Sequence, residues 1–450
     1  MTGTPPGPGD GRVVRAGRAP GTVIRCGLTD LLMADLSVSV VFFFERTLDD
    51  ARLAAGLSHG LDRVPVFGGR LRPRGDALEI VCDDAGVPMT VCDVEESLGE
   101  AIGGLRMPGP RFVDHVDAPA ARQGGRPLLT VRVSRLAGGG TALGCSWHHA
   151  IGDMQTFLLL MRAWSAYAEG TAAPRALLVE DVDAYLDSLL PPEDCGRPGF
   201  RLLDAAEAAS RDRELETALR GTRSVQAYFS EEEAGRIRRE FSAAAGRTLS
   251  MNDVLCAHVV TTIRRLDEDP QARHLAMPVN LRRHLRIPPT LAGNLIGEVY
   301  LPCAPHGEPE ALAAQIRAAV ADFARAHLSL RAGHAFLEAI GPARLRDCVP
   351  IGFDLSRRTF TFTNWSRFGL YDVTFEGSRP TLFSPALNLQ IPWNALLVEG
   401  FGGCGFFLTA AVPARLAGRL RTADGRAALH RFREPADVLP ALAGQVRNLI

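Results

Sequence analysis

The segment 129–168 constrains the fold more than any other part of the sequence. Apolar and polar residues alternate over 129–133 and again over 143–147, and three consecutive glycines, 138–140, lie between the two runs. This pattern indicates a β-hairpin closed by a glycine turn. After Asp153 apolar residues recur at helical spacing, so we expect a helix to begin near this aspartate. The second strand therefore runs into a short turn before the helix, and that turn reads His148-His149-Ala150-Ile151-Gly152-Asp153.

The rest of the chain predicts an α/β (α+β) protein. Its 450 residues exceed one ordinary domain, so we expect two. Residues 39–44 indicate a buried strand, residues 316–323 follow helical spacing, and Ser250 with Asp253 resembles a capping box that begins another helix. Between about Glu169 and Ser210 the pattern loosens, and prolines and glycines there indicate a connection between the domains. The expected order is a disordered tail over 1–20, a first domain over 21–180, a linker over 181–215 and a second domain over 216–450.

Composition and charge argue against several classes of function. The formal net charge of -1 gives no electrostatic basis for binding nucleic acid or an anionic membrane. No stretch reaches the roughly 18 apolar residues of a membrane span, and residues 1–20 lack a signal-peptide pattern, so we expect a cytoplasmic protein. The nine cysteines form no CxxC pair, which indicates neither a zinc site nor a disulfide framework. All 50 basic residues are arginine, a bias that suggests a GC-rich bacterial genome.

His149 and Asp153 are the candidate catalytic pair. His149 stands where a strand ends, and from such a position a side chain can face a crevice while the scaffold holds it still. A neutral imidazole can accept a proton from an attacking hydroxyl, and a carboxylate four residues later can hold the turn. Each residue alone also fits a structural role, Asp153 as a helix N-cap. The i, i+4 spacing could serve a metal ion, but no further ligand is evident, so we predict no metal site.

The turn resembles the HHxxxD motif of the CoA-dependent acyltransferase superfamily, which includes BAHD acyltransferases, chloramphenicol acetyltransferase and the condensation domains of peptide synthetases. Three later segments follow in the BAHD order. They resemble the segment whose arginine pairs with the motif's aspartate, the Gly-Asn segment, and the strand before the DFGWG motif: Pro278-Val279-Asn280-Leu281-Arg282-Arg283, Leu291-Ala292-Gly293-Asn294-Leu295-Ile296-Gly297 and Thr363-Asn364-Trp365-Ser366-Arg367-Phe368-Gly369-Leu370-Tyr371-Asp372-Val373.

In place of DFGWG this chain has Thr374-Phe375-Glu376-Gly377-Ser378, which keeps only the phenylalanine and one glycine. The departure puts the local loop conformation in doubt, and with it the geometry of CoA binding. We therefore identify the chain as a divergent, bacterial member of the BAHD family.

The resemblance implies two similar chloramphenicol-acetyltransferase-like domains, each a mixed sheet with helices. It also implies a channel between them with His149 at its middle, and a segment near 360–395 that crosses to the first domain. His149 would be the general base, and Asp153 an orienting group paired with Arg282. Further candidates for contacts to the oxyanion or the substrate are Thr363, Trp365, Asn294 and His148.

The implied activity is transfer of an acyl group from acyl-CoA to a hydroxyl, or less often an amine, of a small secondary metabolite. Acyl-CoA is then a co-substrate, no permanently bound cofactor is expected, and we expect a monomer. Since the chain has no lysine, the phosphates of CoA must contact arginine, backbone amides or helix N-termini.

Two alternatives stay open. One is a condensation-type enzyme that takes its acyl group from a carrier protein, and the other is a non-catalytic descendant that binds a small molecule. Gly400, Gly402 and Gly405 spell GxGxxG, but they lie between strand-like stretches and begin no helix, so they predict a hairpin turn. Neither a GxSxG elbow nor a GxxxxGK[ST] loop is present, which argues against a serine hydrolase or a nucleoside triphosphatase.

Overall fold

The computed structural model describes residues 10–105, 111–190, 197–268, 271, 273–304, 307–323, 328–357, 359–386, 392–446 and 449–450. The chain divides into two compact units. Unit 1 comprises Met1–Leu189 together with two later segments, Leu285–Leu295 and Arg367–Asn388. Unit 2 comprises Leu190–His284, Ile296–Ser366 and Leu389–Ile450. Each unit therefore contains segments that are distant in the sequence.

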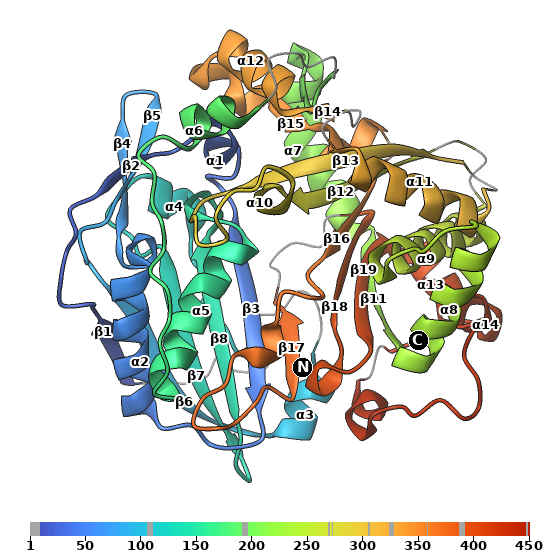
Figure 1. Cartoon of the computed structure of the whole chain (residues 1–450), viewed down its shortest axis with the longest axis horizontal. Helices are drawn as coiled ribbons and strands as arrows, with labels where there is room; N and C mark the ends of the chain where they lie inside the picture. The colour runs from blue at the N-terminus through green and yellow to red at the C-terminus, as the bar shows by residue number, and fades with distance from the viewer. Residues whose placement is uncertain are drawn as a thin grey trace. The chain divides into compact units, whose positions relative to one another are not determined.

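The main sheet of unit 1 is mixed. Its strands lie in the order β1 (Asp10–Val14), β6 (Val87–Ser97), β7 (Leu129–Ala137), β8 (Thr141–His148), β3 (Ser37–Phe44) and β17 (Leu382–Pro385). β6 and β7 are parallel, and the other neighbours are antiparallel (Figure 1). A smaller sheet has the order β2 (Val23–Arg25), β5 (Ala77–Val81) and β4 (Arg70–Arg74). The pairing of β7 with β8 around glycines 138–140 confirms the predicted hairpin.

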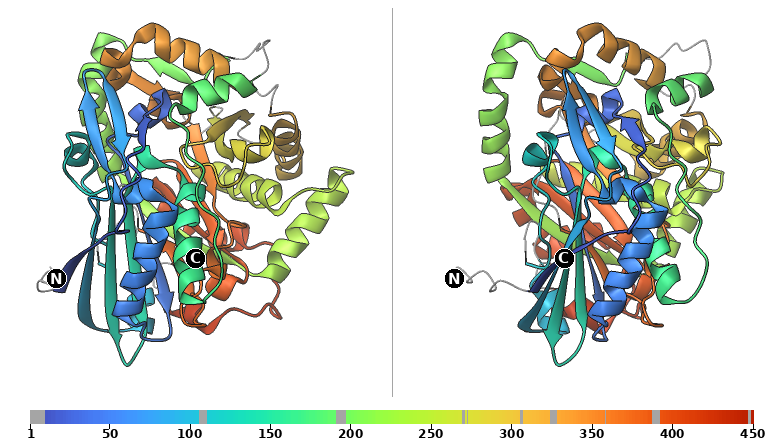
Figure 2. Two further views of the ribbon diagram at one scale, coloured as in Figure 1. Left: turned by 60° about the vertical axis from the view of Figure 1, so that its left-hand side comes forward. Right: turned by 90° about the vertical axis from the view of Figure 1, so that its left-hand side faces the viewer.

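Two long helices of unit 1, α2 (Asp50–Arg63) and α5 (Met154–Ala168), lie side by side on one face of the main sheet (Figures 1 and 2). They pack closely because α2 presents glycine to α5. A Cβ at Gly56 would lie only 2.6 Å from Trp164. The shorter helices of the unit are α1 (Leu28–Leu32), α3 (Leu98–Gly103), α4 (Ala118–Arg122) and α6 (Val182–Leu189).

The main sheet of unit 2 is mixed as well. Its order is β11 (Thr222–Phe229), β19 (Phe406–Pro413), β18 (Asn394–Glu399), β16 (Thr359–Asn364), β12 (Arg273–Asn280) and β13 (Ile296–Cys303). β12, β16 and β18 are mutually parallel neighbours, whereas the remaining pairs are antiparallel. The antiparallel pairing of β18 with β19 confirms that the GxGxxG run is a hairpin turn.

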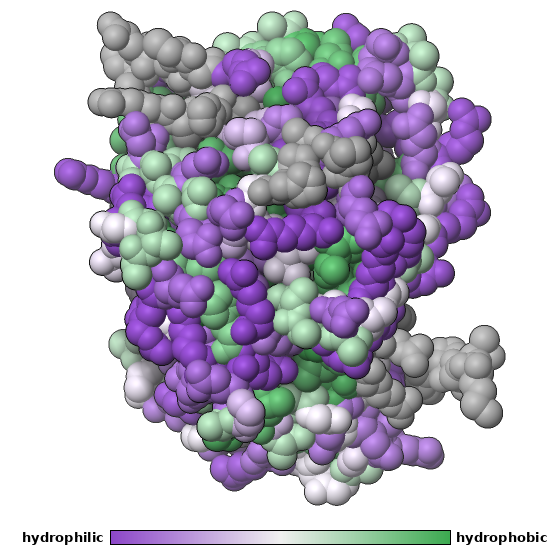
Figure 3. All heavy atoms as spheres, turned by 90° about the vertical axis from the view of Figure 1, so that its right-hand side faces the viewer, coloured by the Kyte–Doolittle hydropathy of each residue, from purple (hydrophilic) through white to green (hydrophobic). Residues whose placement is uncertain are grey.

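Helices α8 (Glu231–Ala244), α9 (Met251–Asp267) and α11 (Pro309–Ala321) pack against one another beside the unit 2 sheet (Figure 1). Ser250 and Asp253 form the predicted capping box at the start of α9, with bonds of 2.7 and 3.3 Å. On the face drawn in Figure 3, hydrophilic residues predominate and hydrophobic ones form small patches. The remaining helices and short strand pairs are α7 (Ala205–Arg220), α10 (Leu281–His284), α12 (Leu330–Ile340), α13 (Ala414–Leu420), α14 (Ala423–Leu429), β9 (Arg197–Pro198) with β14 (Leu328–Ser329), and β10 (Phe200–Leu202) with β15 (Cys348–Pro350).

The prediction of a disordered tail was wrong for residues 10–14, which form β1 because the edge of β6 offers unpaired backbone groups; residues 1–9 lie outside the described range. The predicted linker, of which 191–196 is not described, contains α6 and the start of α7. The segment in place of DFGWG forms a tight turn, in which the backbones of Phe375 and Ser378 exchange bonds of 3.0 and 2.9 Å and the phenylalanine is buried.

Two units, each with a mixed sheet and helices, confirm the predicted fold class. None of the helices that the structure describes combines the length and the apolar character needed to cross a bilayer. The channel expected between the domains stays a prediction.

Candidate active site

The turn between β8 and α5 is held at both ends by side-chain hydrogen bonds. The Trp147 indole donates to the Gly152 carbonyl over 3.0 Å. Asp153 is the N-cap of α5, as predicted for the start of this helix, and its Oδ1 accepts from the Thr156 backbone N–H at 2.9 Å. Gly152 leaves no room for a side chain, because a Cβ there would lie 2.5 Å from Thr156. These contacts fix the turn without any contribution from the side chains of its two histidines.

His148 is fully buried, and the backbone occupies both of its ring nitrogens. Its Nδ1 accepts from the Ala150 N–H at 3.2 Å, and its Nε2 donates to the Ala118 carbonyl at 3.3 Å. Burial, helped by neighbouring His149, lowers the pKa of His148 to about 4. The ring is thus neutral at pH 7, with Nε2 protonated. This arrangement favours a structural role over the substrate contact that the sequence offered as a possibility.

His149 begins a short 3₁₀ turn, His149–Ile151, and is only half-buried. Its backbone N–H donates to the Leu36 carbonyl at 2.9 Å. Its Nδ1 is buried and has no hydrogen-bond partner among the described residues. Burial lowers the pKa of His149, and its own carbonyl, the Asp153 charge and the Asn294 side chain oppose that effect. The ring is therefore neutral near pH 7 and able to accept a proton.

The segment Leu285–Leu295 completes the unit 1 part of the site. Asn294 is buried, and its Nδ2 donates to the His149 carbonyl and to Asp30 Oδ1, both over 2.8 Å. The Leu295 N–H donates to Asp153 Oδ2 at 3.2 Å, and the Gly293 N–H donates to Thr156 Oγ1 at 3.0 Å. Sequence reasoning missed Asp30 entirely. It lies 264 residues before Asn294 and belongs to no motif, so no signal in a single sequence pointed to it.

Unit 2 carries the other three candidates. Arg282 is the second residue after β12 and is buried, and the Asn280 Oδ1 accepts from its backbone N–H at 3.1 Å. Thr363 and Trp365 lie half-buried at the end of β16 and just beyond it. Because β12 and β16 are parallel neighbours, all three residues lie near the carboxyl ends of these two strands.

The structure thus places His148, His149, Asp153 and Asn294 in unit 1, where Asn294 bonds the His149 carbonyl, and it places Arg282, Thr363 and Trp365 in unit 2. The pairing of Asp153 with Arg282 stays a prediction. Within the described ranges, no group of three or more His, Cys, Asp or Glu side chains is placed to hold a metal ion.

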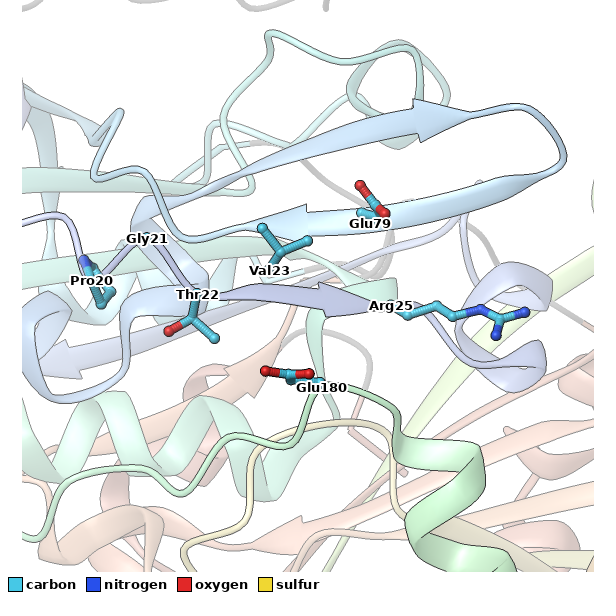
Figure 4. Close-up of a pocket in the computed structure, with 7 residues that line it drawn as sticks. All are labelled: Pro20, Gly21, Thr22, Val23, Arg25, Glu79 and Glu180. Atoms are coloured by element: carbon cyan, nitrogen blue, oxygen red, sulfur yellow. The ribbon is translucent and has the colours of Figure 1, made fainter.

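A surface pocket of unit 1 contains none of these candidates. Figure 4 shows its lining, which includes Arg25, Glu79 and Glu180 beside β2. Arg72 and Arg74 already pair with the Glu79 carboxylate, at 2.7 and 3.2 Å. We therefore do not count this pocket as part of the candidate site.

Comparison with known proteins decides the family. The model of the Transferase family matches residues 18–395. The chain belongs to this family, the BAHD acyltransferases. Rosmarinate synthase of Plectranthus scutellarioides is 27% identical to it over 274 residues, which cover 58% of this chain and 61% of that protein. Agmatine hydroxycinnamoyltransferase 1 of Oryza sativa subsp. japonica is 25% identical over 413 residues, which cover 86% of this chain and 90% of that protein.

Several solved structures have the same fold as this chain. Vinorine synthase has a TM-score of 0.67 and 18% identity over 91% of this chain and 95% of that one. TRI101 of F. graminearum, in complex with coenzyme A and T-2 mycotoxin, has a TM-score of 0.73 and 14% identity over 90% and 98%. The first condensation domain of the calcium-dependent antibiotic synthetase has a TM-score of 0.58 and 16% identity over 92% and 96%. At these identities the similarity shows the fold alone.

Because His148 is buried and neutral, we expect the protein to lose folding stability in acid. Its pKa is about 4 in the folded protein and about 6.5 in an unfolded chain, so the unfolded chain binds more protons between these values. Stability is therefore lost as the pH falls from about 6.5 to 4, on the order of 3 kcal/mol from this residue. The His148→Gln variant, whose amide does not titrate, should show a weaker pH dependence in urea unfolding at pH 7.5 and 5. An equal effect of His59→Gln, on α2, would contradict the assignment.

Replacing Asp153 should cost more folding stability than replacing an ordinary helix N-cap. Asp153→Ala removes the acceptor for Thr156 and leaves the Leu295 N–H without this partner, so we expect about 2–4 kcal/mol of destabilisation. The exposed N-cap of α2, Asp49, provides the matched control, with an expected loss of about 1 kcal/mol for Asp49→Ala. Urea unfolding at pH 7 measures both. Equal losses would show that the Leu295 contact adds nothing.

Proposed function

We propose that this chain transfers an acyl group from acyl-CoA to a hydroxyl or amine of a small molecule, with His149 as the general base. One observation carries the proposal. The His149 imidazole stands at the end of a buried strand, with its backbone fixed by the Leu36 and Asn294 hydrogen bonds and its pKa lowered by burial. A general base must be held in place and be unprotonated at working pH, and the backbone hydrogen bonds and the lowered pKa of His149 support these two conditions.

In the proposed reaction the acceptor's hydroxyl or amine attacks the thioester carbonyl while His149 takes its proton. The new carbon–oxygen or carbon–nitrogen bond forms first, giving a tetrahedral intermediate. The carbon–sulfur bond then breaks, and the imidazolium returns the proton to the departing thiolate. The ring ends in its starting form, so no acyl-enzyme is required.

The other candidates have supporting roles. A guanidinium matches a carboxylate in planar geometry, so Arg282 is suited to pair with Asp153 and to hold it as an orienting group. The tetrahedral oxyanion needs a donor that is in place beforehand, and we assign this task to Thr363 and Trp365. This assignment is supported by the position of both residues at the carboxyl end of β16.

The relatives support an acyltransferase and leave the acceptor open. The names of two relatives point to different acceptor atoms, an oxygen for limonoid 21-O-acetyltransferase of Melia azedarach and the amine agmatine for agmatine hydroxycinnamoyltransferase 1. The TRI101 complex contains coenzyme A together with a small-molecule toxin. We therefore propose acyl-CoA as the donor and a small metabolite as the acceptor.

His149→Ala tests the general base directly. We expect kcat/KM for thiol release from acyl-CoA, in the presence of acceptor, to fall by about 10²- to 10⁴-fold. In the unsubstituted protein kcat/KM should rise with pH through an apparent pKa below the ordinary value of about 6.5, because burial lowers the pKa of His149. The matched control is His59→Ala, on α2. Equal thiol release by His149→Ala and the unsubstituted protein, above the spontaneous rate, would rule out the mechanism.

The donor distinguishes this proposal from the condensation-type alternative, which the similarity to a condensation domain brings in at the level of fold. We expect transfer from free acyl-CoA without any carrier protein. A single panel should compare each acyl group on CoA and on a phosphopantetheinylated carrier protein, with the same alcohols and amines, and detect products by mass spectrometry. Transfer from the carrier alone would favour the alternative.

A further inference from the structure

Asp30 is a buried carboxyl group that the proposed reaction does not use. It lies in α1, and only 5% of its surface is exposed. Its Oδ2 accepts from the Gly27 N–H and its Oδ1 accepts from Asn294 Nδ2, both at 2.8 Å. Burying a carboxyl group is costly, so an acid at this position calls for an explanation beyond filling space.

The Asn294 amide connects this carboxyl to the proposed base. One nitrogen, Nδ2, has two hydrogens, so it donates to Asp30 and to the His149 carbonyl at the same time. Both partners are acceptors, and this fixes which end of the amide faces them. The same side chain also acts on the imidazole, since it partly offsets the lowering of the His149 pKa by burial.

The surroundings of Asp30 are acidic. The pKa of Asp30 is raised to about 7: burial raises it most, the bonds from Asn294 and Gly27 oppose this effect, and the charges of Asp183 and Asp153 add to it. Asp183, on α6, accepts from the Leu28 N–H at 2.8 Å, and the thiol of Cys26 is a further titratable group near Asp30. The Asp30 carboxyl therefore depends on its two hydrogen bonds to ionise near neutral pH.

We propose that Asp30 is a positioning residue, which fixes the direction of the His149 imidazole through the Asn294 amide. This inference rests on the proposed function, because it takes His149 to be the base. The backbone of His149 is then held on both sides, its N–H by Leu36 and its carbonyl by Asn294. Asp30 in turn prevents the amide from rotating.

Asp30→Asn should disable this arrangement with little change in volume. The oxygen of the new amide at position 30 would still accept from the Gly27 N–H. The nitrogen of that amide would then point toward the Nδ2 of Asn294. Two donors cannot bond, so Asn294 must rotate and present oxygen to the His149 carbonyl. We expect kcat to fall by about 10- to 100-fold, because small displacements of a catalytic group have effects of this size, while KM for acyl-CoA stays within about threefold. The matched control is Asp183→Asn, which contacts neither Asn294 nor His149 in the bonds described above.

The exchanged variant, Asp30→Asn with Asn294→Asp, separates positioning from stability. It restores a donor and an acceptor between positions 30 and 294, so the midpoint of thermal unfolding should recover most of the loss of Asp30→Asn. The His149 carbonyl now faces a carboxylate, so kcat should stay low. Recovery of kcat together with stability would overturn the proposal and leave Asp30 a purely structural role.

Nuclear magnetic resonance titration of the His149 ring gives a readout that needs no turnover. Relative to the unsubstituted protein, the pKa of His149 should fall in Asp30→Asn, because rotation of the Asn294 amide removes the effect by which this side chain raises that pKa. It should rise in the exchanged variant, where the side chain at position 294 is a carboxylate. An unchanged titration curve in both variants would refute the inference. If the curves shift as expected but His149→Ala transfers acyl groups normally, only the proposed function fails.

Discussion

The geometry of the site depends on the indole of Trp147. Its ring stacks on Phe157, with 4.2 Å between centroids and 2° between planes, and its N–H donates to Gly152 at 3.0 Å. One side chain thus joins the end of β8, the turn and the first part of α5. Stacking and a buried hydrogen bond reinforce each other here, because each restricts the ring to the orientation that the other requires. His149 lies in the turn between Trp147 and Gly152, the two residues that this hydrogen bond joins.

Neighbouring histidines in this turn have opposite environments. His148 points to the face of the sheet that Ser37 shares, and backbone groups occupy both of its nitrogens. His149 leaves the strand for a 3₁₀ turn, and one of its nitrogens lacks such a bond within the described residues. The difference between the two rings therefore arises from the point at which the strand ends. The catalytic role proposed for His149 therefore rests on this local geometry more than on residue type.

Local patterns in the sequence predicted the local geometry well. The hairpin of β7 and β8, the start of α5 at Asp153 and the capping box of α9 all depend on residues within a few positions of one another. The contact between Asp30 and Asn294 was beyond such reasoning, because it depends on how distant segments pack. The same holds for β1, whose partner strand lies more than seventy residues later. The resemblance to a family supplied the candidate roles, and the structure supplied the neighbours of each candidate.

The late segments of unit 1 have a consequence for how the protein is made. β17, at residues 382–385, forms the edge of the first sheet, and Asn294 secures a residue that was synthesised almost 150 positions earlier. A ribosome must therefore expose most of the chain before the amino-terminal half can complete its sheet. Until then the nascent β3 keeps an unpaired edge, which is a hazard for aggregation. Folding during translation is thus postponed, and fragments truncated before residue 382 should depend on chaperones to remain in solution.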